Sequence, residues 1–395
     1  MEVWATGRVA LVHDFLLDVR GAERVFSALC AMYPDADVFT AVYDEDGTEG
    51  RFAHRNIHTS FLQRLRPTSR TFRSLLPLYP YAMEALDLTG YGLVVSSSSA
   101  WAHGVLPDED AVHISYCHNP FRYAWNARET ALAGRGPVAC ALLGGVLSRW
   151  RQWDWIAAQR VDRYIANSHT TQRRIARYFN RDAVVVYPPV EMERFAPAPV
   201  GDYYLVLSEL MAHKRIAVAV EAFNELRWPL VIAGNGPDVR RLQRLAGPTI
   251  HFEGRVSDAR AAELLARARA LVVTATEEFG IAAVEAQAAG RPVVALAEGG
   301  VRETVVEGET GAFYLRPDTR SLVDTLVAFD PLAVDPQRCV DNAARFDVSR
   351  FRRGVEDVVR EAGVAERPAI ERRRPPRRAR GLTSRRVTAG RGDVR

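Results

Sequence analysis

The sequence predicts an α/β protein with two doubly wound domains, each a parallel β-sheet covered by helices on both faces. Apolar strand-like runs alternate along the chain with helical patterns of roughly ten residues, as in successive βαβ units. The alternation breaks at Pro188-Pro189 and the polar stretch that runs to Pro199. The length of 395 residues is enough for two domains of ordinary size. We therefore expect a first domain at 1–190, a second at 191–345, and a ligand-binding cleft between them at the carboxyl ends of the strands.

Each strand is predicted from a short apolar run, because the strands of a parallel sheet are buried on both faces. In the first domain, strands are expected at 9–12, 93–96, 112–116, 164–167 and 184–187, with helices at 22–32 and 168–179. In the second domain, strands are expected at 205–208, 230–233, 250–252, 271–274 and 293–297, with helices at 215–226, 238–246, 258–268 and 281–289. A further helix at 346–365 is expected to pack back on the first domain.

Charge is distributed unevenly along the chain. Residues 366–395 hold 11 arginines against three acidic residues, so the rest of the chain is mildly acidic although the formal net charge is +4. This tail has no apolar periodicity, and we expect it to be disordered. It is suited to electrostatic contact with anionic lipid or nucleic acid, and equally to no specific partner. Nucleic acid is not the partner that we expect for the protein.

The composition is typical of a soluble globular protein, with 48% apolar and 25% charged residues. The four cysteines are scattered and form no CxxC pair, which favours a reducing compartment. The first residues lack the architecture of a signal peptide, and the weakly polar run 137–147 is too short to span a bilayer. These observations predict a cytoplasmic protein.

Lys214 is the only lysine in a chain that carries 51 arginines. A lysine retained in such a sequence indicates a position that needs a compact ammonium rather than a planar guanidinium, although some lysine must be the last one by chance. Lys214 follows the strand expected at 205–208 and lies at the start of the helix expected at 215–226. Junctions of this kind bind phosphates in open α/β sheets, so Lys214 is a candidate phosphate ligand.

A second candidate site lies between the strand expected at 271–274 and the helix expected at 281–289. Gly280 and the small residues after it allow backbone amides at the helix start to approach an anion closely. Glu277 and Glu285 place acceptor-only carboxylates on either side of that anion, although acidic residues near helix starts often merely cap the helix. Two carboxylates that flank a phosphate site suit a nucleoside diphosphate sugar, which has a diphosphate between two polyols.

These segments resemble the retaining glycosyltransferases of family 4, which have the two-domain GT-B fold. The stretch EEFGIAAVEAQAAGRPVVA, which contains Glu277-x7-Glu285, resembles the signature of that family. SELMAHKRIAVAVEAF resembles its diphosphate-binding strand–loop–helix, FEGRVSD its nucleobase-side loop, and EGGVRETVVEGETGAFY the segment after the glutamate motif. Together they cover most of residues 203–315 in the expected order.

The resemblance implies specific roles in donor binding. Lys214 would bind the donor diphosphate, Glu277 the donor sugar, and Glu285 the ribose hydroxyls. Backbone around Phe279, Gly280 and Ile281 would face the leaving phosphate. Val256, in the nucleobase-side loop, would contact the donor as well.

Two positions depart from the pattern of the family. Many members carry an arginine five residues before the lysine, where this chain has Glu209. A carboxylate would repel a diphosphate, so we expect Glu209 to point away or to pair with an arginine. Arg215, next to Lys214, is a candidate for the missing positive charge. Ala283 stands where related sequences often have proline, a difference with little chemical weight.

The first domain supplies two further candidates. The segment SYCHNPFRYAW, which contains His118, resembles the CHTPxRYxW stretch of bacterial family 4 mannosyltransferases of surface polysaccharide biosynthesis, where the histidine reaches the donor hexose. A lone histidine after a strand is otherwise more often structural. The segment around Gly21 resembles the first loop of the family, where glycine amides lie near the donor phosphate; Ala22 stands where a second glycine is common. His13 and Asp14 fit either that loop or the closure of a strand.

Residues 61–78 mix arginines with bulky apolar side chains. This composition is typical of a surface that meets anionic lipid, and equally of a helix that packs its apolar face inward. Trp150, Trp153 and Trp155 present the same choice between interfacial anchors and core. Because many acceptors of the family are lipid-linked, the resemblance favours peripheral membrane contact through 61–78.

No metal and no cofactor are expected. The acidic clusters 44–46 and 108–110 lie in loop-like stretches, where solvated turns are the better interpretation. Lys214 and the helix start would replace a metal in stabilising a departing diphosphate.

The sequence thus predicts a retaining hexosyltransferase at the inner membrane face, with GDP-mannose as the favoured donor and a lipid-linked or polysaccharide acceptor. A GT-B nucleotide-sugar epimerase and a non-catalytic nucleotide-sugar or nucleic-acid binding protein are the alternatives.

Overall fold

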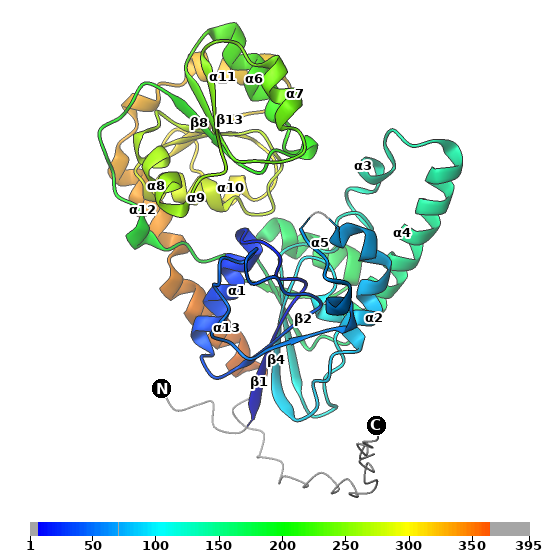
Figure 1. Ribbon diagram of the computed structural model, residues 1–395. Helices are drawn as coiled ribbons and strands as arrows, with labels where there is room; N and C mark the ends of the chain where they lie inside the picture. Colours follow the sequence, from blue (N-terminus) through cyan, green and yellow to red (C-terminus); the bar gives the residue numbers. More distant parts are fainter. Residues whose placement is uncertain (1–6, 70, 364–395) are drawn as a thin grey trace, which may run out of the picture.

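Two parallel β-sheets organise the computed structural model, which describes residues 7–69 and 71–363. The tail predicted at 366–395 lies outside the described residues. The first sheet has seven strands in the order β3-β2-β1-β4-β5-β6-β7, and the second has six in the order β10-β9-β8-β11-β12-β13. Every strand pairing in both is parallel. This confirms the predicted doubly wound α/β class (Figure 1).

The first sheet and its helices occupy the first half of the chain. The strands are β1 (Arg8–His13), β2 (Asp37–Thr40), β3 (Ile57–Thr59), β4 (Tyr91–Ser98), β5 (Val112–Cys117), β6 (Arg163–Ala166) and β7 (Ala183–Val185). The α-helices are α1 (Gly21–Met32), α2 (Tyr79–Glu84), α3 (Arg128–Leu132), α4 (Pro137–Ala158) and α5 (His169–Phe179).

The second sheet and its helices follow the double proline. The strands are β8 (Tyr204–Leu207), β9 (Leu230–Ala233), β10 (Ile250–Gly254), β11 (Leu271–Val273), β12 (Val293–Leu296) and β13 (Gly311–Tyr314). The helices are α6 (Ile216–Leu226), α7 (Val239–Leu245), α8 (Asp258–Arg267), α9 (Ile281–Ala288), α10 (Val301–Thr304), α11 (Thr319–Ala328), α12 (Pro336–Ala343) and α13 (Val348–Glu361).

Helix α13 returns to the first domain and lies beside α1 (Figure 1). One face of α13 is apolar: Phe351, Val355, Val358 and Val359 are buried in the same core cluster as Leu11 of β1. Burial of each large apolar side chain contributes about 1.5–3 kcal/mol to the stability of the fold, so these contacts hold α13 firmly against the first sheet.

The strand order reverses between β1 and β4 in the first sheet and between β8 and β11 in the second. In a doubly wound sheet, loops at such a reversal diverge to opposite faces and leave a crevice outside the carboxyl ends of the strands. The two sheets therefore present two crevices, and the segments that follow β1, β5, β8 and β11 meet around one cavity.

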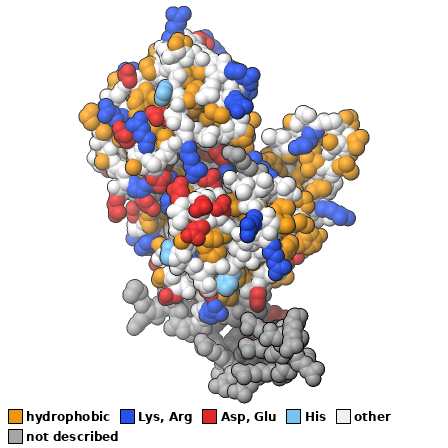
Figure 2. Space-filling view, viewed as in Figure 1, with side chains coloured by type: hydrophobic (Ala, Val, Ile, Leu, Met, Phe, Trp, Pro, Cys, Tyr) orange, Lys and Arg blue, Asp and Glu red, His pale blue; other side chains and the backbone are white. Residues whose placement is uncertain are grey.

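Helices α3 and α4 project from the first domain as an arm beside the second domain (Figure 1). Side chains of hydrophobic type gather on this arm, with arginines among them (Figure 2). The segment 61–78 is no continuous α-helix; it forms two 3₁₀ helices, η1 (Phe61–Leu65) and η2 (Phe72–Leu78). Among the described residues, no helix is both long and apolar enough to cross a membrane.

Candidate active site

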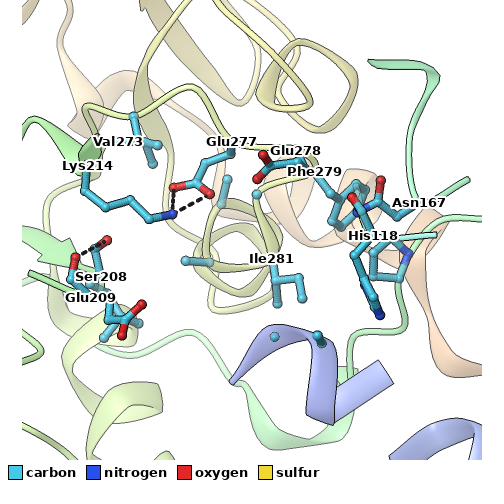
Figure 3. A pocket seen from close by; sticks show the side chains of 18 of the residues that line it. His118, Asn167, Ser208, Glu209, Lys214, Val273, Glu277, Glu278, Phe279 and Ile281 are labelled. Atoms are coloured by element: carbon cyan, nitrogen blue, oxygen red, sulfur yellow. Dashed lines mark hydrogen bonds and ion pairs between the residues drawn. The ribbon is translucent and has the colours of Figure 1, made fainter. Parts of the chain in front are cut away.

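A cavity of about 380 Å³ lies between the two domains (Figure 3). Seven of the ten residues predicted for the site line it: Gly21, His118, Lys214, Glu277, Phe279, Gly280 and Ile281. The other three, Arg215, Val256 and Glu285, do not line this cavity. The structure therefore brings together residues that are far apart in sequence and come from both domains.

Lys214 and Glu277 form an ion pair inside the cavity (Figure 3). The Lys214 Nζ donates to both carboxylate oxygens of Glu277, at 2.8 and 2.9 Å. The backbone is also held, because the Thr274 hydroxyl donates to the Lys214 carbonyl oxygen at 2.7 Å. Lys214 ends the 3₁₀ helix η5 (Ala212–Lys214), and both side chains of the pair are largely buried. The side chain of the single lysine is thus fixed at the cavity wall.

The pKa of Glu277 reflects this environment. Burial alone would raise the pKa of the carboxyl, but the charge and hydrogen bonds of Lys214, together with the charge of Arg122, hold it below its ordinary value. Glu277 is therefore an ionised acceptor at neutral pH. An ionised carboxylate accepts hydrogen bonds only, which suits it to bind sugar hydroxyls.

The loop that follows Glu277 is shaped by a glycine turn after β12. The Gly300 amide donates to the Glu277 carbonyl oxygen at 2.7 Å. A Cβ at Gly299 would lie 2.2 Å from that oxygen, and one at Gly300 would lie 2.3 Å from the carbonyl oxygen of Glu278. Only glycines allow the turn to approach so closely. The turn therefore acts as a support for the loop that carries Glu277.

The start of α9 faces the cavity without a capping side chain. Gly280, the residue before the helix, has a φ of 94°, a left-handed conformation that favours glycine. The first amides of a helix have no acceptor within the helix and carry part of the positive end of its dipole. The amides at Ile281 and Ala282 consequently offer an anion site next to the Lys214 ammonium.

His118 follows β5 and lies on the opposite wall of the cavity (Figure 3). Its Nε2 lies 2.8 Å from the hydroxyl of Ser97, and its backbone oxygen accepts from the Asn167 amide at 3.0 Å. Burial and the neighbouring His13 lower the pKa of His118 to about 3. The imidazole is therefore neutral at physiological pH and can contact a sugar hydroxyl as a neutral donor or acceptor.

Glu285 faces a second cavity, of about 440 Å³, that shares Ile281 with the first. Its Oε1 lies 3.5 Å from Arg24 Nη1 of α1 and 4.0 Å from Arg194 Nη1 of the linker. Burial raises the pKa of Glu285, and the two arginines oppose this effect only in part. Arg24 also pairs with Asp258 of α8, so this cluster joins the two domains.

Arg215 and Val256 do not line the first cavity, whereas Glu209 does. Arg215 is the left-handed N-cap of α6, and its guanidinium lies 3.7 Å from Glu298. Val256 packs against the apolar core of the second domain. Glu209 lines the cavity and pairs with Arg20 of the first domain at 3.0 Å, which confirms the expected arginine partner.

Sequence reasoning missed a group of polar residues at the first-domain wall. Arg122 donates to Glu278 at 2.9 Å, and Arg174 lies 3.4 Å from the same oxygen. Arg122 also lies 3.2 Å from His213, whose pKa is lowered to about 4 by burial and by the charges of Arg122 and Lys214. Arg122, His213 and Glu278 stand in segments whose resemblance was described above, whereas no sequence pattern pointed to Arg174.

Asp14 closes the end of β1 rather than entering the cavity. Its carboxylate accepts the backbone amides of residues 99, 100, 101 and 102, at 2.6, 3.1, 2.7 and 2.6 Å. Four donors satisfy a buried carboxylate fully. Asp14 therefore fixes the loop after β4 next to Ser97, the residue that holds His118.

Two family models match this chain, one over each domain. Residues 19–194 match the family described as glycosyltransferase family 4, and residues 191–344 match glycosyl transferases group 1. The two matches adjoin at the linker between the sheets and together span both domains.

Two relatives come from Mycolicibacterium smegmatis. A GDP-mannose-dependent alpha-(1-6)-phosphatidylinositol monomannoside mannosyltransferase is 31% identical over 210 residues, which cover 43% of this chain and 53% of that protein. A D-inositol 3-phosphate glycosyltransferase is 30% identical over 199 residues, which cover 42% and 44%. The chain thus spans about half the length of the curated relatives it matches.

Solved structures show the same fold over most of the chain. Sucrose-phosphate synthase from Thermosynechococcus elongatus has a TM-score of 0.71 at 17% identity and covers 91% of this chain and 100% of its own. Anabaena HepE, solved in complex with UDP-glucose, has a TM-score of 0.66 at 16% identity and covers 89% and 99%. Both support a GT-B architecture.

Proposed function

Because the chain belongs to family 4 of the glycosyltransferases, we propose that it transfers a hexose from a nucleoside diphosphate sugar to an acceptor hydroxyl. The observation that carries the proposal is the Lys214–Glu277 pair beside the uncapped start of α9. This arrangement combines an ammonium and free helix amides, which suit a diphosphate, with an ionised carboxylate, which suits sugar hydroxyls.

In the proposed complex the diphosphate lies between the Lys214 ammonium and the amides at the start of α9. Lys214 then exchanges part of its contact with Glu277 for phosphate oxygens, and Glu277 becomes free to accept from the hexose. His118, held by Ser97 on the other wall, contacts the hexose as a neutral group. Glu285 accepts from the ribose hydroxyls in the adjoining cavity, where Arg24 now occupies it.

We propose that the reaction retains the anomeric configuration by front-face substitution. The bond between the anomeric carbon and the diphosphate oxygen breaks, and the acceptor oxygen forms its bond on the same face. The acceptor proton passes to the departing diphosphate oxygen. Lys214 and the α9 amides stabilise the negative charge that develops on the leaving group, which is the role of preorganised donors in such sites.

GDP-mannose is the donor that we propose. The His118 segment and the name of the mycobacterial mannosyltransferase support it. A UDP-linked hexose is the competing choice. The acceptor that we propose is lipid-linked or a growing glycan, reached by peripheral contact of the cytoplasmic protein with the inner membrane face through 61–78. In that segment Phe61, Leu65 and Leu78 are exposed, while Leu62 and Phe72 are buried.

The test is a thermal-shift and turnover comparison. GDP, UDP, TDP and ADP are added separately, and the melting temperature should rise most with GDP. GDP-mannose should then be consumed when acceptor lipid extract is present, with release of GDP. A larger rise in melting temperature with UDP would indicate that the donor is a UDP-sugar. If no nucleotide stabilises the protein and no donor releases its nucleoside diphosphate, the proposed transfer reaction is contradicted.

A further inference from the structure

The α3–α4 arm carries apolar side chains that no part of the described chain covers. The buried residues of α4, Leu147, Asp154, Ala157 and Ala158, all lie at or beyond its midpoint. In the first half, Val138 is 75% and Leu142 is 70% exposed. Among the described residues, few large apolar side chains are as open to solvent as these two. A folded protein rarely displays such a patch without a partner for it.

The arm also lacks negative charge. Residues 130–153 contain no Asp or Glu but three arginines, and residues 50–83 contain none but six arginines, in a chain that has 48 acidic residues. Arg64, Arg66, Arg73, Arg135 and Arg149 are exposed, and none pairs with a carboxylate within the described residues. Exposed cations without anionic neighbours favour an anionic partner.

The two acid-free segments adjoin in space. Trp153 of α4 donates from its indole nitrogen to Glu84, at the end of α2, at 3.0 Å. Trp150 and Trp153 pack on the same core cluster as Leu75 and Leu76 of η2. Figure 2 shows hydrophobic side chains with arginines along the arm and on the side of the first domain below it. The segments therefore supply a continuous edge of the molecule.

The arm is coupled to the cavity through the loop that carries His118 and Arg122. The Trp125 indole nitrogen donates to the buried Asp154 at 2.6 Å, and Arg151 Nε donates to the Ala124 carbonyl oxygen at 2.9 Å. These bonds fix the second half of α4 to the end of the loop. Whatever binds the arm is therefore held at a fixed place relative to the cavity.

We infer that the α3–α4 arm inserts its first-half apolar residues into the interface of an anionic lipid bilayer, with residues 61–78 lying on the headgroups. A second copy of the chain fits the same patch poorly, because self-pairing would bring arginines against arginines. The inference adds an inserting element to the membrane contact proposed for 61–78. It is tested without donor or acceptor, so its failure leaves the proposed transfer reaction untouched.

Cys140 provides the reporter. It lies in the first half of α4 and is the one partly exposed cysteine in the described chain, since Cys30, Cys117 and Cys339 are buried. The full chain is labelled at Cys140 with an environment-sensitive fluorophore and mixed with vesicles of phosphatidylglycerol and phosphatidylcholine. We expect a blue shift and quenching by lipids that carry a nitroxide on the acyl chain. With phosphatidylcholine alone the shift should be at least tenfold smaller at equal lipid. An unshifted, unquenched label on anionic vesicles would overturn the inference.

Matched variants separate the arm from the arginine-rich tail, which all of them share. Val138→Glu with Leu142→Glu should reduce partitioning to anionic vesicles at least tenfold. Leu315→Glu with Val327→Glu replaces similarly exposed residues of the second domain and should change it less than twofold. Equal loss in both pairs would contradict insertion of the arm.

Substitution of surface arginines tests the charge. Gln at Arg64, Arg66 and Arg135 should weaken binding by on the order of fivefold per residue, whereas Gln at the exposed Arg227, Arg240 and Arg244 should not. Sedimentation equilibrium completes the test. A dimer that the Val138→Glu and Leu142→Glu changes dissociate would assign the patch to a second copy instead of lipid.

Discussion

Glu277 lies in the loop before α9 and Glu285 lies in α9 itself, and the two carboxyl groups have opposite environments. Glu277 is held by Lys214 of its own domain through two short hydrogen bonds, and its pKa is lowered. Glu285 meets its nearest cation, Arg24, across the domain boundary at 3.5 Å, and its pKa is raised. The end of the cavity that we propose for the phosphates is thus built within the second domain. The end that we propose for the ribose depends on the position of the first domain.

The two carboxylates therefore differ in whether their contacts are in place before the ligand binds. An ion pair within one rigid unit survives any hinge motion, so it is available before the ligand binds. A contact between units is made or broken as the domains move, and a ligand must compete with it. We expect changes at the first end to affect chemistry, and changes at the second to affect nucleotide affinity.

The largest effect is expected at Lys214. Lys214→Ala should reduce kcat/KM for the donor by about 10²- to 10³-fold, because it removes a fixed charge that stabilises the leaving group. Steady-state release of nucleoside diphosphate measures this. Arg215→Ala is the matched control, since Arg215 pairs with Glu298 outside the cavity, and it should change kcat/KM less than threefold. Near-normal turnover in Lys214→Ala would show that the ammonium takes no part in the reaction.

A smaller effect is expected at Glu285. Glu285→Ala should weaken binding of the nucleoside diphosphate by about 10- to 100-fold, the usual cost of losing hydrogen bonds to a charged group. Isothermal titration of GDP and UDP measures it. Glu263→Ala, which removes a carboxylate of α8 that pairs with Arg260, serves as the control. If Glu285→Ala and Glu263→Ala bind the nucleotide equally well, the ribose role is wrong.

A stability comparison separates the two carboxylates by the sign of their pKa shifts. The ionised Glu277 stabilises the fold above its unfolded pKa, near 4.3, and this stabilisation is lost as pH falls through the lower folded pKa. Glu277→Gln should therefore lower Tm at pH 7, by on the order of 2 °C, with a difference that closes in acid.

The sign is reversed for Glu285. Its folded pKa is raised, so its ionisation costs stability as pH rises above about 4.3. Glu285→Gln should raise Tm at pH 7 and lose that advantage in acid. Melting curves of both variants from pH 3.5 to 8 provide the comparison. If both substitutions change Tm in the same direction at pH 7, the environments of the two carboxyl groups are not opposed.

The smallest effect is expected from a chelator. If Lys214 and the α9 amides neutralise the diphosphate, excess EDTA should change the rate of transfer less than twofold. The same assay on Lys214→Ala sharpens the comparison, because a cation could compensate for the missing ammonium there. Complete loss in the wild type, restored by Mn²⁺, would contradict the assignment of the charge to Lys214.

Much of the fold was predictable because continuous apolar runs identify parallel strands. The segments 9–12, 230–233 and 293–297 all lie in strands, within one residue at each end. Strands β2, β3 and β13 were missed, because polar residues or a glycine leave no run of four apolar residues within them. Helix α4 was missed because its apolar residues surround the helix instead of forming one stripe. Residues 61–78 form two 3₁₀ helices instead of one α-helix, and Pro77 lies inside the second of them, η2.

In the site, sequence reasoning reached the residues whose position is set locally. Lys214, Glu277 and Gly280 follow strands at a strand-order reversal, so their place can be inferred from the chain around them. Arg24 and Arg174 become relevant only through contacts across the domain boundary, and short-range sequence patterns carry no information on that distance. Arg215 does not line the cavity, and its left-handed φ of 53° could not be inferred from its neighbours in the sequence.

A chain with one lysine has one ε-amino group, and that group lies at the proposed phosphate site. Amine-selective reagents such as pyridoxal phosphate with borohydride can therefore label the cavity without any engineered residue, apart from the chain's own α-amino group, whose lower pKa near 7.7–8.0 allows it to be blocked first. The ion pair with the Glu277 carboxylate holds this amine in place at the cavity wall. Occupancy of the cavity can then be followed in unmodified wild-type protein as protection of a single peptide in a mass spectrum.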